Sequence, residues 1–142
     1  MSQYTEALQK RTWSYSSVHQ YDDCPRSFFL QRIEHVPQKN NAFALYGSFV
    51  HEILEKYFKG LITIPEMQEL YVTDYEARVN LKFPPNRWSN LAETYYQDGL
   101  RFLQNFKGLH ENFRVLGAEL EVRMPVSGFQ TIGYIDLLLE NT

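Results

Sequence analysis

The segment Thr131-Ile132-Gly133-Tyr134-Ile135-Asp136-Leu137-Leu138-Leu139 places one carboxylate in the middle of an apolar run. Upstream, residues 115–124 alternate in polarity, which is typical of a β-strand with one apolar and one polar face. The apolar face holds Leu116, Ala118, Leu120, Val122 and Met124, and the other holds Val115, Gly117, Glu119, Glu121 and Arg123. Pro125 ends the first run, and Ser127 with Gly128 predicts a tight turn, because glycine tolerates positive φ. We therefore predict a β-hairpin of strands 115–124 and 130–139.

The register of this hairpin brings two acids together. If Val126 faces Phe129, Glu119 faces Asp136 on the neighbouring strand. Like charges directly opposite each other destabilise a sheet unless a positive group lies between them, and a divalent cation fits that requirement. From the hairpin alone an alternative stays open, in which the acids are solvated on an exposed edge or the register is slipped by one residue.

Composition limits the classes of function. The 142 residues carry a net charge of -3, with a pI near 5.8, so no broad cationic surface is expected to drive nucleic-acid binding. The length fits one domain, 1–142. A single cysteine excludes an internal disulfide and favours a cytoplasmic location, and no long uncharged apolar run predicts a membrane span.

Helices are expected to fill the chain before the hairpin. Residues 1–13 are expected to form an N-terminal arm. Ser14 is predicted to cap a helix from Tyr15 to about Asp23, with Val18 and Tyr21 buried. Further helices are predicted to begin at Pro25, to span 42–59, to open at the Thr63 and Glu66 capping box, and to span 90–106 after a Ser89 cap. Helices followed by strands indicate an α+β fold, or an α/β sheet that is incomplete.

The helix predicted over 42–59 carries a histidine in an unusual setting. Its apolar stripe is Tyr46, Phe49, Val50, Ile53, Leu54 and Tyr57. His51 lies beside this stripe, one turn after Gly47. A glycine in a helix interior costs up to about 1 kcal/mol relative to alanine, so it usually serves close packing or leaves space for a ligand. His51 is therefore either a metal ligand or a histidine at the boundary of the core.

Four segments in order resemble the motifs of RecB-like nucleases in the PD-(D/E)XK superfamily. Residues 13–29 resemble the N-terminal motif with its Cys-Pro-Arg and aromatic pair, and residues 47–58 resemble the helix that carries a glycine and a metal-binding histidine. Residues 116–119 and 133–136 resemble the two following motifs, each ending in an acid. The resemblance covers nearly the whole chain.

The resemblance implies an α/β restriction-endonuclease-like core and a function. His51 and Asp136 would hold Mg²⁺ or Mn²⁺, Glu119 would be an additional or water-mediated ligand, and all three would be catalytic. Hard oxygen ligands suit these ions. The implied activity is hydrolysis of DNA phosphodiester bonds by an exonuclease, in a repair, recombination, CRISPR or phage system.

The sequence also departs from that family. The superfamily site needs a further strand with an acid, one intervening residue and a lysine, and residues 137–142 contain no lysine. Glu121-Val122-Arg123 is only a loose mimic. We therefore expect the N-terminal portion of a longer or split nuclease, inactive alone, whose exposed strand edge pairs with a companion chain or a second copy.

Cys24 is either a small buried residue at a helix junction or an iron-sulfur ligand in a longer protein. Some RecB-like relatives use this cysteine with three others for an iron-sulfur cluster, but this chain has one cysteine and is not expected to build one.

Two alternatives to the nuclease remain: a non-catalytic nuclease-like module that binds DNA or a protein, and a helical interaction domain whose motif matches are coincidental.

Overall fold

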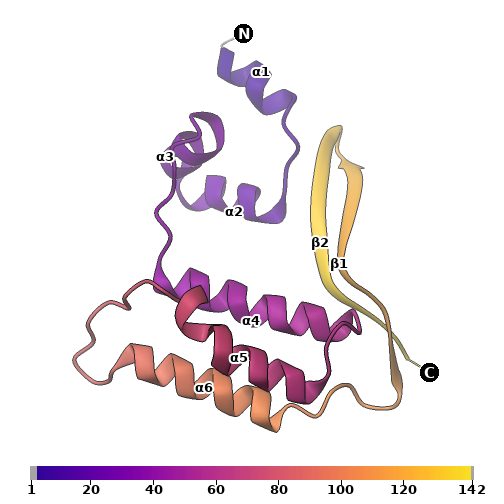
Figure 1. The fold of residues 1–142 in the computed structure, drawn as a ribbon. Helices are drawn as coiled ribbons and strands as arrows, with labels where there is room; N and C mark the ends of the chain where they lie inside the picture. Colours follow the sequence, from indigo (N-terminus) through magenta and orange to yellow (C-terminus); the bar gives the residue numbers. More distant parts are fainter. Residues whose placement is uncertain (1–2, 142) are drawn as a thin grey trace. The chain divides into compact units, whose positions relative to one another are not determined.

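A computed structural model describes residues 3–141, and it describes side-chain surroundings from Thr5 onward (Figure 1). Helices precede a single two-stranded sheet, so the predicted α+β class is confirmed. The elements are α1 (Gln3–Gln9), α2 (Tyr15–Asp23), α3 (Pro25–Phe28), the π-helical η1 (Phe29–Ile33), α4 (Ala42–Phe58), α5 (Ile64–Arg78), α6 (Leu91–Asn105), β1 (Phe113–Val126) and β2 (Phe129–Asn141).

Contacts group these elements into two compact units. The first contains residues up to 39 together with 119–135, which form the turn half of the hairpin. The second contains residues 40–118 together with 136–141, and so holds α4, α5, α6 and the open end of the hairpin. The expectation of one domain over 1–142 stays a prediction.

In the first unit, α2 has the predicted bounds, but not the predicted buried face. The Ser14 side chain accepts a hydrogen bond from the backbone N–H of Ser17. In turn, the Ser17 hydroxyl oxygen accepts one from the backbone N–H of Ser14. Val18 and Tyr21, which were expected in the core, are 51% and 46% exposed. They line an open apolar hollow against the hairpin instead, because few other elements cover this short helix.

The junction after α2 forms as Pro25 predicts. Cys24 ends α2 and caps α3, with its Sγ accepting the backbone N–H of Ser27 at 3.4 Å. The helix continues from Phe29 as a π-turn, and Phe28 is buried. Cys24 itself is exposed, so its interpretation as a small buried residue is wrong.

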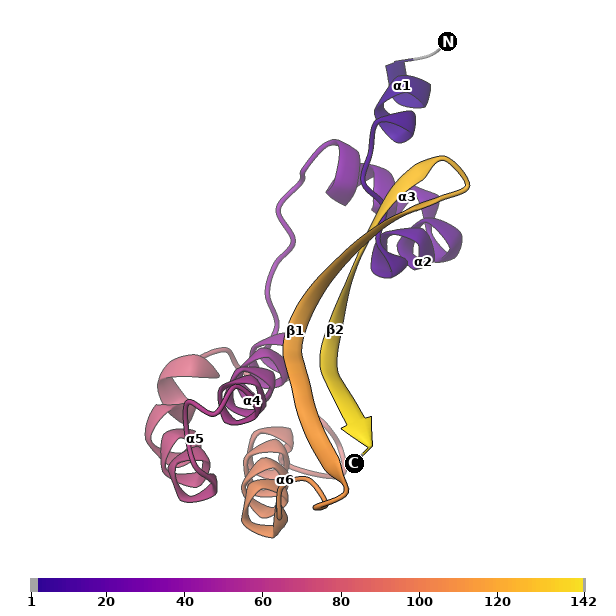
Figure 2. The same cartoon turned by 90° about the vertical axis from the view of Figure 1, so that its right-hand side faces the viewer.

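The range expected as an arm, 1–13, contains regular structure where it is described. Residues 3–9 form α1, and Trp13 pairs in parallel with β2. The Trp13 N–H donates to the carbonyl of Gln130 at 2.8 Å, and the Ile132 N–H donates to the carbonyl of Trp13 at 2.8 Å. This short pairing ties the N-terminal segment to the turn half of the hairpin seen in Figure 2.

The second unit has an aromatic core between α4, α5 and α6. Its buried members are Phe49, Ile53, Met67, Tyr71, Tyr75, Val79 and Leu103. Tyr71 stacks on Phe49 and on Tyr96, with ring centroids 5.8 and 5.7 Å apart, and its hydroxyl donates to the Tyr96 carbonyl at 3.0 Å. Burial raises the pKa of Tyr75 to about 12, with the neighbouring Tyr46 adding to the shift. Phe49 and Ile53 are buried in this core, and the other members of the predicted stripe pack against it, so the inward face predicted for the 42–59 helix is confirmed.

Local capping sets the ends of these helices. Glu66 accepts hydrogen bonds from the backbone and hydroxyl of Thr63, each at 2.7 Å, as the capping box predicts. For α6 the prediction was one residue early, because Asn90 rather than Ser89 caps the helix with its side chain. Ala92 is exposed in the first turn of α6.

The hairpin confirms the predicted turn and extends beyond the predicted strands. Ser127 and Gly128 have φ of 50° and 85°, as a tight two-residue hairpin turn requires. Pro125 lies inside β1 rather than closing it. Near the turn, the Thr131 hydroxyl donates to the Met124 carbonyl and the Tyr134 hydroxyl donates to the Glu121 carboxylate, in agreement with the predicted register.

The predicted alternation of β1 does not match its burial. Leu116, Leu120 and Met124 are 52%, 36% and 53% exposed, while Ala118 is buried. Glu119 has φ 54°, in the left-handed region that residues other than glycine rarely adopt. Such a residue interrupts the pleat, so the two-residue period does not run unbroken through the strand.

Two mid-helix glycines predict opposite responses to alanine. At Gly99 on α6 an added Cβ would lie 2.3 Å from the Tyr71 hydroxyl and 2.8 Å from the Tyr46 hydroxyl, whereas at Gly47 on α4 it would meet nothing within 4 Å. We expect Gly99→Ala to destabilise the protein by about 1–3 kcal/mol and Gly47→Ala to stabilise it by up to about 1 kcal/mol. Urea unfolding measures both, and equal effects would contradict the packing seen here.

Candidate metal centre

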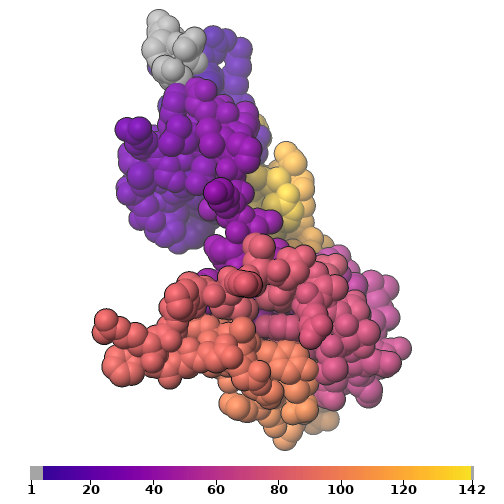
Figure 3. All heavy atoms as spheres, turned by 60° about the vertical axis from the view of Figure 1, so that its left-hand side comes forward, coloured from indigo at the N-terminus to yellow at the C-terminus, as the bar shows by residue number. Residues whose placement is uncertain are grey.

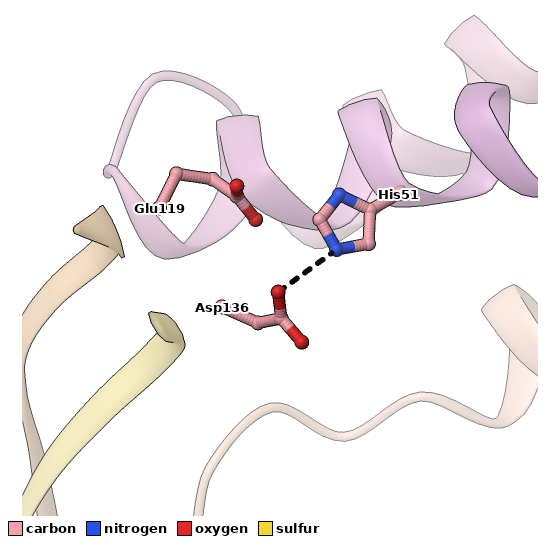
Figure 4. A group of neighbouring side chains, drawn as sticks. All are labelled: His51, Glu119 and Asp136. Carbon is pink, nitrogen blue, oxygen red and sulfur yellow. Dashed lines mark ion pairs between the residues drawn. The ribbon is translucent and has the colours of Figure 1, made fainter. Parts of the chain in front are cut away.

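His51 and Asp136 meet within the second unit. His51 is placed by α4, whose buried Phe49 and Ile53 fix the rotation of the helix. Asp136 comes from β2, and its Oδ1 lies 3.7 Å from Nε2 of His51 (Figure 4). The two side chains are 51% and 78% exposed, so both are accessible to solvent. The structure therefore brings these two residues together, and their role as metal ligands stays a prediction.

Glu119 adds a third donor to this pair. It lies on β1, directly after Ala118. One ligand atom from each of His51, Glu119 and Asp136 lies within 4.8 Å of the others. The candidate residues chosen from the sequence are thus brought together, with Glu119 half-buried and in the left-handed conformation.

The helix face beside this group is open. Gly47, Ser48, His51, Glu52 and Glu55 line a shallow hollow on α4. Because a Cβ at Gly47 would touch nothing, close packing does not explain this glycine. This part of α4 therefore presents open space beside His51.

An ion pair that the sequence did not predict joins α4 to α5 next to His51. Glu52 pairs with Lys56 at 2.9 Å and with Arg78 of α5. The hydrogen bond from Lys56, then the charges of Lys56 and Arg78, hold the pKa of Glu52 below its usual value. The four-residue spacing to Lys56 is a signal that sequence reasoning uses, whereas Arg78 is distant in sequence and its role is visible only in the fold.

Cys24 does not belong to this group of donors. It lies in the first unit, where its thiol caps α3. None of the residues described here gathers with it into a set of metal donors, since the group of histidine and acids above contains no cysteine. The expectation that this chain builds no iron-sulfur cluster stays a prediction.

Comparison with protein families supports the interpretation of the site. Residues 12–142 match the sequence profile of the PD-(D/E)XK nuclease superfamily. The chain belongs to this superfamily. It has no significant match among curated proteins or among solved structures. The superfamily assignment covers all three donors, and hydrolysis of nucleic acids is the activity from which the superfamily takes its name.

The donor set fits the divalent metal expected of a PD-(D/E)XK nuclease. Two carboxylates and one imidazole provide hard oxygen and nitrogen ligands, which suit Mg²⁺ and Mn²⁺ better than soft metals. Their solvent exposure leaves room for the water molecules that Mg²⁺ normally retains. Separately, none of the helices described in the structure is long and apolar enough to cross a membrane.

The left-handed backbone of Glu119 leads to a prediction that separates stability from metal binding. That conformation costs about 1–2 kcal/mol for a residue with a Cβ, and glycine removes the strain but adds chain entropy. We expect Glu119→Gly to raise the metal-free stability by about 0.5–1 kcal/mol and to weaken Mn²⁺ binding. Chemical unfolding and calorimetric titration measure the two quantities. A less stable variant with unchanged affinity would refute both parts.

Proposed function

We propose that this chain carries the metal centre of a divalent-metal-dependent DNA nuclease, a RecB-like exonuclease that hydrolyses phosphodiester bonds. The observation that carries the proposal is the convergence of His51, Glu119 and Asp136, from three sequence motifs, within 4.8 Å. The superfamily match over residues 12–142 supports the same reaction class.

Each residue has a distinct role in the proposal. Carboxylate oxygens of Asp136 and Glu119 and an imidazole nitrogen of His51 would hold the cation. Mg²⁺ or Mn²⁺ would polarise the phosphate and lower the pKa of a water molecule. The hollow beside Gly47 and Ser48 leaves the helix face open for a phosphodiester to approach. Rapid hydrolysis also needs a cation that offsets charge on the phosphate in the transition state.

Arg123, a cation on β1, is engaged by Glu121, with its Nε 2.6 Å from the carboxylate. We therefore expect the described residues to bind metal, and cleavage to become faster when an acid-x-lysine strand is supplied by a companion polypeptide. A second copy that pairs on the strand edge is the other source we consider.

A cleavage assay tests this proposal. A linear DNA labelled at one end and a closed circular DNA of the same sequence would be incubated with Mn²⁺, because an exonuclease degrades only the linear form. Glu121→Ala is a matched control for Asp136→Ala, since both acids lie on the hairpin but Glu121 pairs with Arg123. Activity that depends on Mn²⁺ and is lost only in Asp136→Ala supports the proposal, and activity retained in Asp136→Ala contradicts it.

The pairing of Arg123 with Glu121, which occupies that cation, favours one second candidate, a non-catalytic module that keeps the nuclease fold to bind DNA or a protein. This candidate requires no metal. Unchanged Mn²⁺ affinity in both His51→Ala and Asp136→Ala would support it over the nuclease. Isothermal titration calorimetry of the two variants distinguishes the candidates without any need for cleavage.

A further inference from the structure

The loop between α5 and α6 presents the most exposed large hydrophobic side chain among the residues described. Trp88 is 89% exposed. The segment, coloured salmon, projects from the helices of the second unit in Figure 3. A tryptophan in water is unusual because this side chain buries a large apolar area in most folds. On a projecting loop, the indole is accessible to a binding partner.

The charge of this loop is opposite to that of the whole protein. Residues 79–92 contain Lys82 and Arg87 and no acid, although the chain carries a net charge of -3. Both cations are exposed, and within the described part of the chain neither forms an ion pair. A polyanion is therefore the partner that complements this loop.

The loop is held at its base, although its tip projects. Phe83 stacks on Tyr95 with ring centroids 5.1 Å apart and contacts Phe43 edge-on at 5.2 Å. The Asn86 side chain accepts the Trp88 backbone N–H at 2.9 Å, and Pro84 and Pro85 restrict the backbone between these anchors. An aromatic side chain on a restrained loop loses less conformational entropy when it binds.

We propose that Trp88 and Arg87 bind single-stranded DNA, with the indole stacked on a base and the guanidinium paired with a phosphate. Stacking requires an unpaired base, which a duplex does not offer, so the loop selects single strands. The loop contacts Phe43 in the first turn of α4, and His51 lies about 12 Å further along the same helix. This inference rests on the proposed nuclease for its substrate class, and adds the state of the DNA that it takes.

The test measures binding without metal. The probe is a short fluorescein-labelled thymidine oligonucleotide, followed by anisotropy in EDTA with the full chain, so that no cleavage occurs. We expect Trp88→Ala to weaken binding by roughly tenfold and Trp88→Phe to restore most of it. Arg87→Ala is expected to reduce the slope of log affinity against log salt by about 0.7, whereas Lys107→Ala, an exposed cation elsewhere in the same unit, is not expected to weaken binding as much.

Three measurements decide the outcome: the affinity for an abasic strand, the affinity of Trp88→Ala, and self-association. An abasic strand of equal charge should bind wild type no better than the thymidine strand binds Trp88→Ala. Equal binding of thymidine and abasic strands by wild type, or full affinity in Trp88→Ala, overturns the inference. Self-association that Trp88→Ala removes without a change in oligonucleotide affinity also overturns it and assigns the loop to a protein contact. Because the assay contains EDTA and measures binding alone, failure of the metal centre does not affect this result.

Discussion

Replacement of Asp136 by alanine is expected to weaken Mn²⁺ binding by about two orders of magnitude or more. The Asp136 carboxylate lies 3.7 Å from the His51 imidazole and is one of the three donors within 4.8 Å of one another. Its loss leaves one carboxylate and one imidazole, which bind a hard divalent ion weakly in water. Isothermal titration calorimetry measures the affinity directly.

Stability measurements make this first prediction sharper. Asp136 is 78% exposed, so its replacement should change the metal-free stability by no more than about 0.5 kcal/mol. Wild type should gain thermal stability with Mn²⁺ because the ion binds the folded state, and Asp136→Ala should not. Glu121→Ala serves as the control, because Glu121 is an exposed carboxylate on β1 that bonds to Arg123 and Tyr134. Equal loss of affinity in both variants would place the ion elsewhere.

Replacement of Tyr71 by alanine is expected to destabilise the protein by about 3–5 kcal/mol. The ring is fully buried between Phe49 and Tyr96, and its truncation leaves a large cavity in the aromatic core. Because ordinary domains are stable by only about 5–15 kcal/mol, this change threatens folding of the unit that holds His51. Urea unfolding followed by circular dichroism gives the free energy.

Two further variants separate the causes of that loss. Tyr71→Phe keeps the ring but removes the hydroxyl that donates to the Tyr96 carbonyl, and should cost about 1–2 kcal/mol. Tyr15→Ala removes a tyrosine that is 83% exposed and should change stability by less than about 0.5 kcal/mol. A small effect of Tyr71→Ala, comparable to that of Tyr15→Ala, would show that the aromatic core is not packed as described.

The sequence by itself determined the features that depend on a few neighbouring residues. The Ser14 cap, the Thr63 and Glu66 capping box and the Ser127-Gly128 turn form as predicted, because each rests on hydrogen bonds or backbone preferences within one turn. The order of the motifs also identified His51, Glu119 and Asp136 as one group before their positions in space were known.

Tertiary structure alone decided what covers each side chain. Val18 and Tyr21 have the spacing of a buried face yet line an open hollow, and Trp88 is exposed on a loop although it is strongly apolar. The left-handed backbone at Glu119 breaks an alternation that the sequence shows as regular, and the empty space beside Gly47 appears only once α4 is surrounded by its neighbours. Caps and turns satisfy backbone groups locally, whereas burial and convergence of donors depend on segments far apart in the chain.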